Sequence, residues 1–274
     1  MNRLFVANKP AGVGSNFYLG SLKRKYGVKK AGFSGTLDPF AKGTLVIGFG
    51  SYTKLFRFLD KTPKKYRATL WLGAYSKSLD IERIESVEAL EPFSQERVLE
   101  AVVSLEGEHT YTPPSFSAKQ INGVRAYELA RRDEAVDLKK VTSRVYSAEL
   151  ISYMHPFVTF EVEVSEGTYV RSLGEMVAQK LGLKSSALSY LHRLREGKFF
   201  FDDEKPLDIK ESLAIKENFY KKDMQDIAYG KKLDIKNFEN QEDGSYYVDC
   251  GTFLAIFTLK ENIVHYELGR VEIC

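Results

Sequence analysis

The sequence predicts an α+β fold, and three patterns along the chain support this class. Apolar and polar side chains alternate at residues 66–72 and again at residues 158–164, which is typical of half-buried strands. Apolar residues recur at helical spacing after Ser94, and a second amphipathic helix is expected from about Val170 to Leu181. Such strands with separate helices favour a mixed, mainly antiparallel sheet with flanking helices over a doubly wound parallel sheet.

The remaining elements and a change of composition suggest how the chain is divided. The other expected elements, in chain order, are a strand at residues 3–8, a helix from Ser15 to about Tyr26, a glycine-punctuated loop from Ala31 to Gly43, a buried strand in TLVIGFG, a short helix in YTKLFRFL and a helix from Gly123 to about Arg132. After about Lys205 the chain becomes acidic and lysine-rich, and short strands follow from Gly244 to Cys274. We therefore expect a large domain over residues 1–210 and a small, C-terminal β-rich domain over residues 211–274.

Composition excludes several classes of protein. The 274 residues are 43% hydrophobic and 13% aromatic, which is enough for a sizeable core, so a largely disordered chain is excluded. The only two cysteines, Cys250 and Cys274, lie near the C-terminus outside any disulfide or metal-ligand pattern, which fits a reducing cytoplasm. The sequence has neither a signal peptide nor an apolar run of about 18 residues that could span a membrane. We expect a cytoplasmic protein without membrane partners, and a monomer by default.

The charge of the chain is unevenly distributed. With 40 basic and 37 acidic side chains, the net charge is only +3. Residues 1–70, however, hold 14 Lys and Arg side chains against only Asp38 and Asp60, a net charge of +12, while residues 71–110 and 201–274 each carry −6. A basic N-terminal third on a near-neutral chain indicates a surface for a polyanion such as nucleic acid. A solvated basic face is the alternative explanation.

Neither a metal ion nor a cofactor is expected from the motifs. The histidines lie far apart and lack the spacing of zinc-binding motifs; they are His109, His155, His192 and His265. The segments GVGSNFYLG and GFGS lack the lysine and the spacing of a phosphate-binding P-loop, and no GxSxG nucleophile elbow occurs. Any chemistry is therefore expected from the side chains of the protein itself.

Asp38 is the main candidate for a catalytic residue. It lies in GFSGTLDPFAKG and is the only acid among the first 59 residues. Gly32 and Gly35 permit a tight turn and Pro39 keeps the chain out of a helix, so the carboxylate would be presented from a loop. Nearby lysine and arginine side chains would keep this carboxylate ionised and nucleophilic. The alternative is a purely structural Asp-Pro turn.

Five segments, taken in order, resemble the motifs of one protein family. GTLDPFAKGTLVIGFG, which contains Asp38, closely resembles the GxLDPxAxGxLxxxxG motif of the TruB family of tRNA pseudouridine synthases. The four other segments that are similar to family motifs are NKPAGVGS, KKYRATLWLG, PPSFSAKQINGVRAYELAR, and GTYVRSL with LSYLHRL. The resemblance spans about residues 3–200, and five ordered motifs are far more specific than a single loop.

The resemblance implies a fold, a reaction and a set of roles. The fold would be the pseudouridine synthase sheet followed by a small PUA-like domain. The reaction would be isomerisation of uridine to pseudouridine in the T-loop of tRNA, without metal or cofactor, with Asp38 as nucleophile. Tyr66 matches the residue that stacks on the flipped uracil, with a core tyrosine as the alternative. Tyr169 and Arg171 match the pair that lines the base pocket and holds the carboxylate, which would lower the pKa of Asp38.

Further expectations from the resemblance concern five other residues. Asp80 falls where the family often has a polar residue facing the base, and Leu191 would pack near the pocket or simply in the core. Phe33 stands where many members have histidine, so a general acid-base role is not expected at this position. Contacts with RNA are expected at Phe33, Ser34 and Lys9.

Two alternatives to this enzyme are compatible with the sequence. The first is a non-catalytic tRNA-binding or tRNA-folding protein on the same fold, which the retained Asp38 opposes because a negative charge weakens the binding of RNA. The second is a synthase of the same family that acts on another RNA. The net acidic C-terminal segment is a poor composition for phosphate contact, so we expect it to make a limited RNA contact or only to complete the fold.

Overall fold

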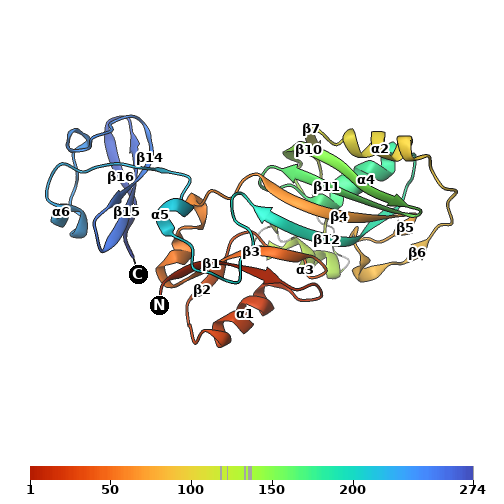
Figure 1. The fold of residues 1–274 in the computed structure, drawn as a ribbon, viewed down its shortest axis with the longest axis horizontal. Helices are drawn as coiled ribbons and strands as arrows, with labels where there is room; N and C mark the ends of the chain where they lie inside the picture. Colours follow the sequence, from red (N-terminus) through yellow and green to blue (C-terminus); the bar gives the residue numbers. More distant parts are fainter. Residues whose placement is uncertain (118, 122, 133, 135–137, 274) are drawn as a thin grey trace.

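The structure is a computed structural model that describes residues 1–117, 119–121, 123–132, 134 and 138–273, and it confirms the α+β class. Figure 1 shows an elongated molecule, with a large sheet and its helices at one end and a smaller strand-rich unit at the other. The two ends of the chain lie side by side. The side-chain amide of Asn2 donates a hydrogen bond to the backbone carbonyl of Glu272 (3.1 Å).

The large sheet is built from eight strands. Its order is β1–β3–β12–β4–β11–β10–β7, and β2 pairs with β3. The strands are β1 (Arg3–Lys9), β2 (Ala31–Phe33), β3 (Lys42–Phe49), β4 (Lys64–Leu72), β7 (Gly107–Tyr111), β10 (Val141–Met154), β11 (Phe157–Val164) and β12 (Ser186–Glu196). All neighbours are antiparallel except β12 and β3, which pair in parallel. The predicted mixed, mainly antiparallel sheet is therefore confirmed.

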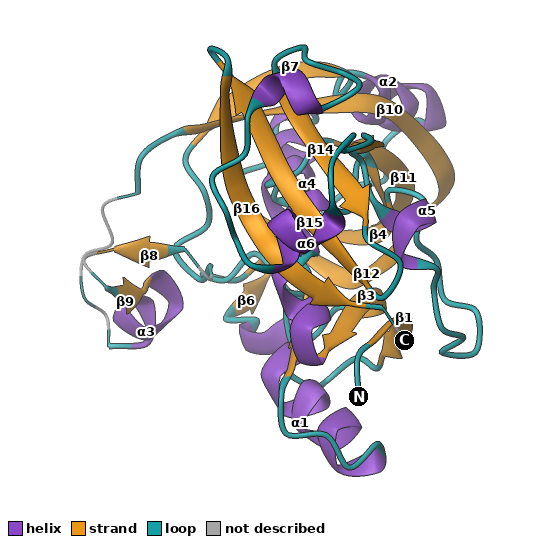
Figure 2. Ribbon diagram, turned by 90° about the vertical axis from the view of Figure 1, so that its left-hand side faces the viewer, coloured by secondary structure: helices purple, strands orange, loops and turns teal. Residues whose placement is uncertain are grey.

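The helices are divided between the two ends of the molecule, with the last α-helix beside the C-terminal strands (Figure 1). The helices are α1 (Ser15–Lys25), α2 (Gln95–Val103), α3 (Ala126–Arg131), α4 (Val170–Lys180), α5 (Ile209–Ser212) and α6 (Met224–Ala228), and the short strand pairs are β5 (Ala74–Tyr75) with β6 (Ser86–Val87) and β8 (Gln120–Ile121) with β9 (Val124–Arg125). In Figure 2 the β8–β9 hairpin and α3 stand to one side of the sheets. Within the described ranges, no helix is long and apolar enough to cross a membrane.

One predicted helix takes a different form. YTKLFRFL was expected to be one short helix, and the chain here forms two 3-10 helices, Gly50–Lys54 and Phe56–Phe58. Three of the buried residues of this stretch, Tyr52, Leu55 and Phe58, are spaced by three, which matches the three-residue turn of a 3-10 helix.

The main core lies between one face of the sheet and two helices. The buried faces of β4 and β11 consist of the alternating residues that the sequence indicated, namely Tyr66, Ala68, Leu70, Leu72, Val158, Phe160, Val162 and Val164. Residues of α2 and α4 pack against this face. Gly174 of α4 lies so close to the sheet that a Cβ atom there would be 2.9 Å from Leu70 Cδ1. The first turn of α4 is thereby held at a fixed position relative to β4.

A second sheet forms the strand-rich unit near the C-terminus. It has the order β13–β14–β15–β16, with β13 (Lys216–Glu217), β14 (Gly244–Asp249), β15 (Phe253–Lys260) and β16 (Ile263–Glu272). Leu254 and Ile256 of β15 share a buried cluster with Leu4 and Val6 of β1, so the two sheets pack together. The division into residues 1–210 and 211–274 stays a prediction, and its boundary falls within α5.

The central position of Phe160 gives a test of the main core. We expect Phe160→Ala to lower the free energy of unfolding by about 3–5 kcal/mol, because the fully buried ring leaves a cavity between sheet and helices. Ile151→Ala on the neighbouring β10, where the side chain is 41% exposed, should cost less than about 1 kcal/mol. Urea denaturation followed by circular dichroism measures both, and equal losses would contradict this description of the core.

Candidate active site

The loop between β2 and β3 carries Asp38 and is held by internal hydrogen bonds. Ser15, the first residue of α1, donates a hydrogen bond from Oγ to the carbonyl of Leu37 (2.8 Å) and accepts one from the Leu37 amide (3.0 Å). Gly35 has φ of +62°, a left-handed conformation that favours glycine, so the predicted glycine turn is present. These contacts hold the backbone next to Asp38 in one conformation.

Lys9 supports the same loop from inside the protein. Its fully buried ammonium donates hydrogen bonds to the carbonyls of Pro10 (2.9 Å), Val13 (2.5 Å) and Pro39 (3.3 Å). Burial lowers the pKa of Lys9 to about 8, although the nearby carboxylate of Asp38 acts to raise it. The expected RNA contact at Lys9 is wrong, because the whole side chain is enclosed and its donors are used by the backbone.

Arg171, in the first turn of α4, contacts the candidate nucleophile. Its side chain is 4% exposed, and Nη2 lies 3.0 Å from Asp38 Oδ2 while Nη1 lies 3.3 Å from Asp80 Oδ2. The guanidinium also donates hydrogen bonds to the carbonyls of Ser78 (2.7 Å) and Phe116 (2.8 Å). One buried cation therefore joins two carboxylates and two backbone segments, a geometry to which the planar guanidinium is well suited.

Asp80 holds Arg171 from the side opposite to Asp38. Its buried carboxylate accepts hydrogen bonds from Ser78 Oγ (2.6 Å) and from the amide of Glu82 (3.0 Å) in addition to its contact with Arg171. Asp80 does not line the cavity that Tyr66 lines, and instead borders a second, smaller cavity that Asp38 and Arg171 share. The expectation that Asp80 faces the base is therefore replaced by a role in holding the guanidinium.

The surroundings of Asp38 make ionisation of its carboxyl less favourable than in water. Burial raises the pKa of Asp38 and outweighs the positive charge of Arg171, which acts to lower it; Asp80 raises it and Lys9 lowers it. Arg171 thus acts in the expected direction, but burial has the larger effect and the net pKa of Asp38 lies above the ordinary value. The carboxylate is recessed between protein walls, yet 32% of the side-chain surface stays open to an incoming molecule.

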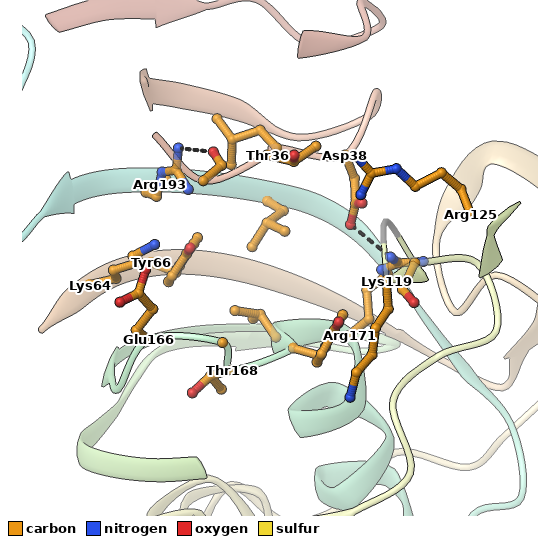
Figure 3. A pocket seen from close by; sticks show the side chains of 17 residues that line it. Thr36, Asp38, Lys64, Tyr66, Lys119, Arg125, Glu166, Thr168, Arg171 and Arg193 are labelled. Carbon is orange, nitrogen blue, oxygen red and sulfur yellow. Dashed lines mark hydrogen bonds and ion pairs between the residues drawn. The ribbon is translucent and has the colours of Figure 1, made fainter. Parts of the chain in front are cut away.

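A cavity of about 400 Å³ opens beside the Asp38–Arg171 pair (Figure 3). Five of the predicted site residues line it: Asp38, Tyr66, Tyr169, Arg171 and Leu191. They come from the β2–β3 loop, β4, the start of α4 and β12, which are neighbours because β12 lies between β3 and β4. Charged side chains also border the cavity, namely Lys64, Lys119, Arg125, Glu166 and Arg193. The structure thus brings the principal candidates into one site.

Tyr66 and Leu191 form an apolar part of the cavity wall. Both side chains are nearly buried, at 7% and 5% exposure, and both belong to the main core. Tyr66 faces Val162 on one neighbouring strand and Arg193 on the other. The sequence allowed two interpretations for each residue, a place in the core or a place at the base pocket. Both apply here, because a core side chain that forms part of the cavity wall also contacts a molecule that enters the cavity.

Known proteins resemble this chain in sequence over its whole length. Residues 23–170 match the profile described as TruB family pseudouridylate synthase (N terminal domain). The tRNA pseudouridine synthase B of Sulfurimonas denitrificans is 59% identical, over 99% of this chain and 100% of the relative. The chain belongs to the TruB family. The tRNA pseudouridine synthase B of Campylobacter curvus is 53% identical over 100% of both chains.

A solved structure supports the fold of this TruB-family chain. A chain in the crystal structure of a Cbf5–Nop10–Gar1 complex superposes with a TM-score of 0.70, covering 99% of this chain and 84% of that one. Because the two are only 19% identical in sequence, this likeness concerns the arrangement of helices and strands.

Two residues that precede the TruB-family aspartate have different environments. Ser34 is 2% exposed and donates a hydrogen bond from Oγ to Glu196 Oε1 (2.8 Å). The expected RNA contact at Ser34 is therefore wrong, because its hydroxyl points into the protein. Phe33 is partly buried against the apolar cluster of β1 and β3, and its contact with RNA stays a prediction.

A group of buried ions below the β2–β3 loop was not predicted from the sequence. Lys64 Nζ lies 3.2 Å from Glu196 Oε1, and Arg193 Nη2 lies 3.4 Å from Glu196 Oε2. A period of two along a strand places Lys64 on the same face as Tyr66 and Arg193 on the same face as Leu191, which is the signal that could have found both cations. Among the described residues, no three His, Cys, Asp or Glu side chains are grouped as metal ligands.

Arg171 gives a test of the site that does not require substrate. We expect Arg171→Leu to lower the free energy of unfolding by about 3–5 kcal/mol near neutral pH, because Asp38 and Asp80 lose their shared cation. Without it, Asp38 keeps the burial that raises its pKa and loses the positive charge that lowers it, so this carboxyl has a higher pKa in the folded than in the unfolded protein and the folded state binds more protons. Protonation therefore stabilises the folded variant when the pH lies below the pKa of the unfolded state, and this stabilisation is lost as the pH rises. The loss of stability caused by Arg171→Leu accordingly becomes smaller as the pH falls.

Urea unfolding of the wild type and the variant at about pH 5 and about pH 8 measures this difference. The matched control is Arg195→Leu, which removes a partly exposed ion pair with Glu163 (2.6 Å) and should cost less than about 1 kcal/mol. A defect in Arg171→Leu that grows toward acid pH would contradict the assigned electrostatics.

Proposed function

We propose that this chain isomerises uridine to pseudouridine in the T-loop of tRNA, at position 55, with Asp38 as the nucleophile. The observation that carries the proposal is the 3.0 Å ion pair between Asp38 and Arg171 at the wall of a cavity that Tyr66 also lines. Membership of the TruB family supports the reaction, and full-length relatives named tRNA pseudouridine synthase B support the choice of RNA.

The reaction requires a carboxylate and little else. The bond between the sugar and a ring nitrogen of uracil breaks, the base rotates, and a ring carbon forms the new bond to the sugar while its proton is lost and the nitrogen gains one. Attack of Asp38 on the sugar, attack on the base, and removal of a sugar proton all start from the ionised carboxylate. Arg171 keeps that carboxylate oriented toward the cavity, so no metal or cofactor is needed for any of these routes.

The cavity provides the groups that a flipped uridine needs. Extruding a base from folded RNA costs a few kcal/mol, and stacking on an aromatic face offsets part of that cost. Tyr66 offers such a face beside Leu191, and Tyr169 lines the same space. The rim supplies cationic side chains at Lys119 and Arg125, which suit the phosphates on either side of the flipped nucleotide.

The charge distribution supports RNA as the partner. The first 70 residues carry a net charge of +12, and Asp38 and Tyr66 lie within them. We infer that the T-stem-loop docks over this basic segment and that the enzyme acts as a cytoplasmic monomer. A binding protein without activity is less favoured, because a recessed, arginine-paired carboxylate adds nothing to the affinity for a polyanion.

The decisive experiment is to map pseudouridine in unmodified tRNA after incubation with the protein. We expect one modified site, in the T-loop, and we expect Asp38→Asn to abolish its formation while RNA affinity stays equal or improves, because a negative charge is removed. Chemical labelling of pseudouridine measures turnover, and filter binding measures affinity. The proposal would be contradicted by full turnover of Asp38→Asn, or by pseudouridine that forms only at sites outside the T-loop.

The raised pKa of Asp38 predicts the pH dependence of the reaction. Since only the ionised carboxylate reacts, kcat/KM should fall at low pH with a midpoint above the ordinary aspartate pKa of about 3.9. Asp80→Asn removes a negative charge that raises the pKa of Asp38, so its midpoint should move to lower pH. Single-turnover rates on a T-stem-loop from about pH 4 to 8 test both statements. An upward shift in Asp80→Asn would show that the acid limb belongs to another group.

A further inference from the structure

Glu196, the last residue of β12, is a fully buried carboxylate at the floor of the catalytic loop. Oε1 accepts the hydrogen bond of Ser34 (2.8 Å) and lies 3.2 Å from Lys64 Nζ, while Oε2 lies 3.4 Å from Arg193 Nη2. All four side chains are less than 10% exposed. Glu196 does not line the cavity, so it has no route to substrate, whereas Lys64 and Arg193 do line it.

The partners of Glu196 determine the course of the loop that leads to Asp38. Arg193 donates hydrogen bonds from Nη2 to the carbonyl of Gly35 (3.0 Å) and from Nε to that of Thr44 (2.8 Å), which ties the loop to β3. Gly35 packs directly on the ions: a Cβ atom there would lie 3.0 Å from Lys64 Nζ and 3.2 Å from Glu196 Oε1. The backbone three residues before Asp38 is therefore shaped around this group.

Charge balance makes Glu196 the essential member of the group. Lys64 and Arg193 place two positive charges in a nearly dry region, and Glu196 is the carboxylate within ion-pair distance of both. Buried cations without a counter-ion are strongly unfavourable, and they relieve the strain by moving toward water. The available opening is the cavity, so loss of this anion would move Lys64, Arg193 or both toward the place that the base is to occupy.

We propose that Glu196 is a positioning residue for the reaction: as the shared counter-ion of Lys64 and Arg193 and the hydrogen-bond partner of Ser34, it fixes the loop that presents Asp38. Arg171 then fixes the carboxylate itself, so the nucleophile is held by two separate ionic groups, one on each side. This inference rests on the proposed function, because Asp38 is the group that Glu196 positions. It assigns Ser34, which is buried away from RNA, a definite task.

The test compares three substitutions in the full-length protein. Glu196→Gln keeps the shape of the side chain and removes its charge, and Glu196→Asp keeps the charge on a shorter side chain. Ser34→Ala removes only the hydrogen bond between the loop and Glu196. The matched control is Glu163→Gln on β11, which removes the carboxylate of the ion pair with Arg195. Steady-state rates on a T-stem-loop give kcat and KM separately.

We expect Glu196→Gln to lower kcat about tenfold or more with KM within about threefold, because misplacement of the nucleophile affects the chemical step rather than docking. Glu196→Asp should recover at least about threefold of that loss, and Ser34→Ala should lower kcat about threefold while the protein stays folded at the assay temperature, although its melting temperature falls because a buried hydrogen bond is lost. Glu163→Gln should stay within about twofold of wild type. A merely structural role would lower the rate only in proportion to the loss of folded protein, so kcat is calculated per folded molecule, with the folded fraction measured by circular dichroism; a kcat per folded molecule equal to that of wild type would contradict the positioning role.

Hydrogen–deuterium exchange tests the positioning without turnover, so its result is separate from the fate of the proposed function, which the wild-type assay on tRNA decides. The amides of Ser34 and Leu37 are bonded to the Val46 carbonyl and to Ser15 Oγ. They should exchange faster in Glu196→Gln and Ser34→Ala and at the wild-type rate in Glu163→Gln. Wild-type kcat or unchanged exchange in folded Glu196→Gln overturns the inference. If that variant does not fold, the same results in Ser34→Ala overturn it.

Discussion

A buried guanidinium needs a partner for each donor, and Arg171 takes its partners from three other segments of the chain. Asp38 comes from the β2–β3 loop, Ser78 and Asp80 from the turn after β5, and Phe116 from the segment after β7. Because leaving a buried charge unpaired costs several kcal/mol, these segments are coupled to one another through a single side chain. The same enclosure that makes the pairing strong raises the pKa of Asp38, so the carboxylate is held by directional contacts rather than by water.

The parts of the structure that follow from local rules could be predicted from the sequence. A period of two along β4 and β11 correctly placed Phe160 and its neighbours in the core, and Ser94 begins α2 as its N-cap. The motifs predicted that Asp38, Tyr66, Tyr169, Arg171 and Leu191 belong to one site. They meet because each lies at the end or on the inner face of an element, and these elements come together at the centre of the sheet.

The contacts that the sequence did not reveal depend on partners that are distant along the chain. Ser34 and Glu196 are 162 residues apart, and no pattern near either residue indicates that a hydroxyl and a carboxylate will meet. Lys9 was expected to contact RNA, yet its ammonium is buried and three backbone carbonyls take the place of water around it. The strand β12 was also not predicted, although it is central and joins β3 to β4, since apolar and charged residues are mixed along it.

The shared cluster of β1 and β15 has a consequence for how the protein is made. Leu4 and Val6 leave the ribosome first, but Leu254 and Ile256, which cover them, are synthesised after almost all of the rest of the chain. During translation this cluster therefore stays incomplete and partly exposed until β15 has been made, a condition under which nascent chains associate with one another or with chaperones. The apolar side chains of β1 are made first, but the cluster that buries them is complete only when the last strands of the chain have been made.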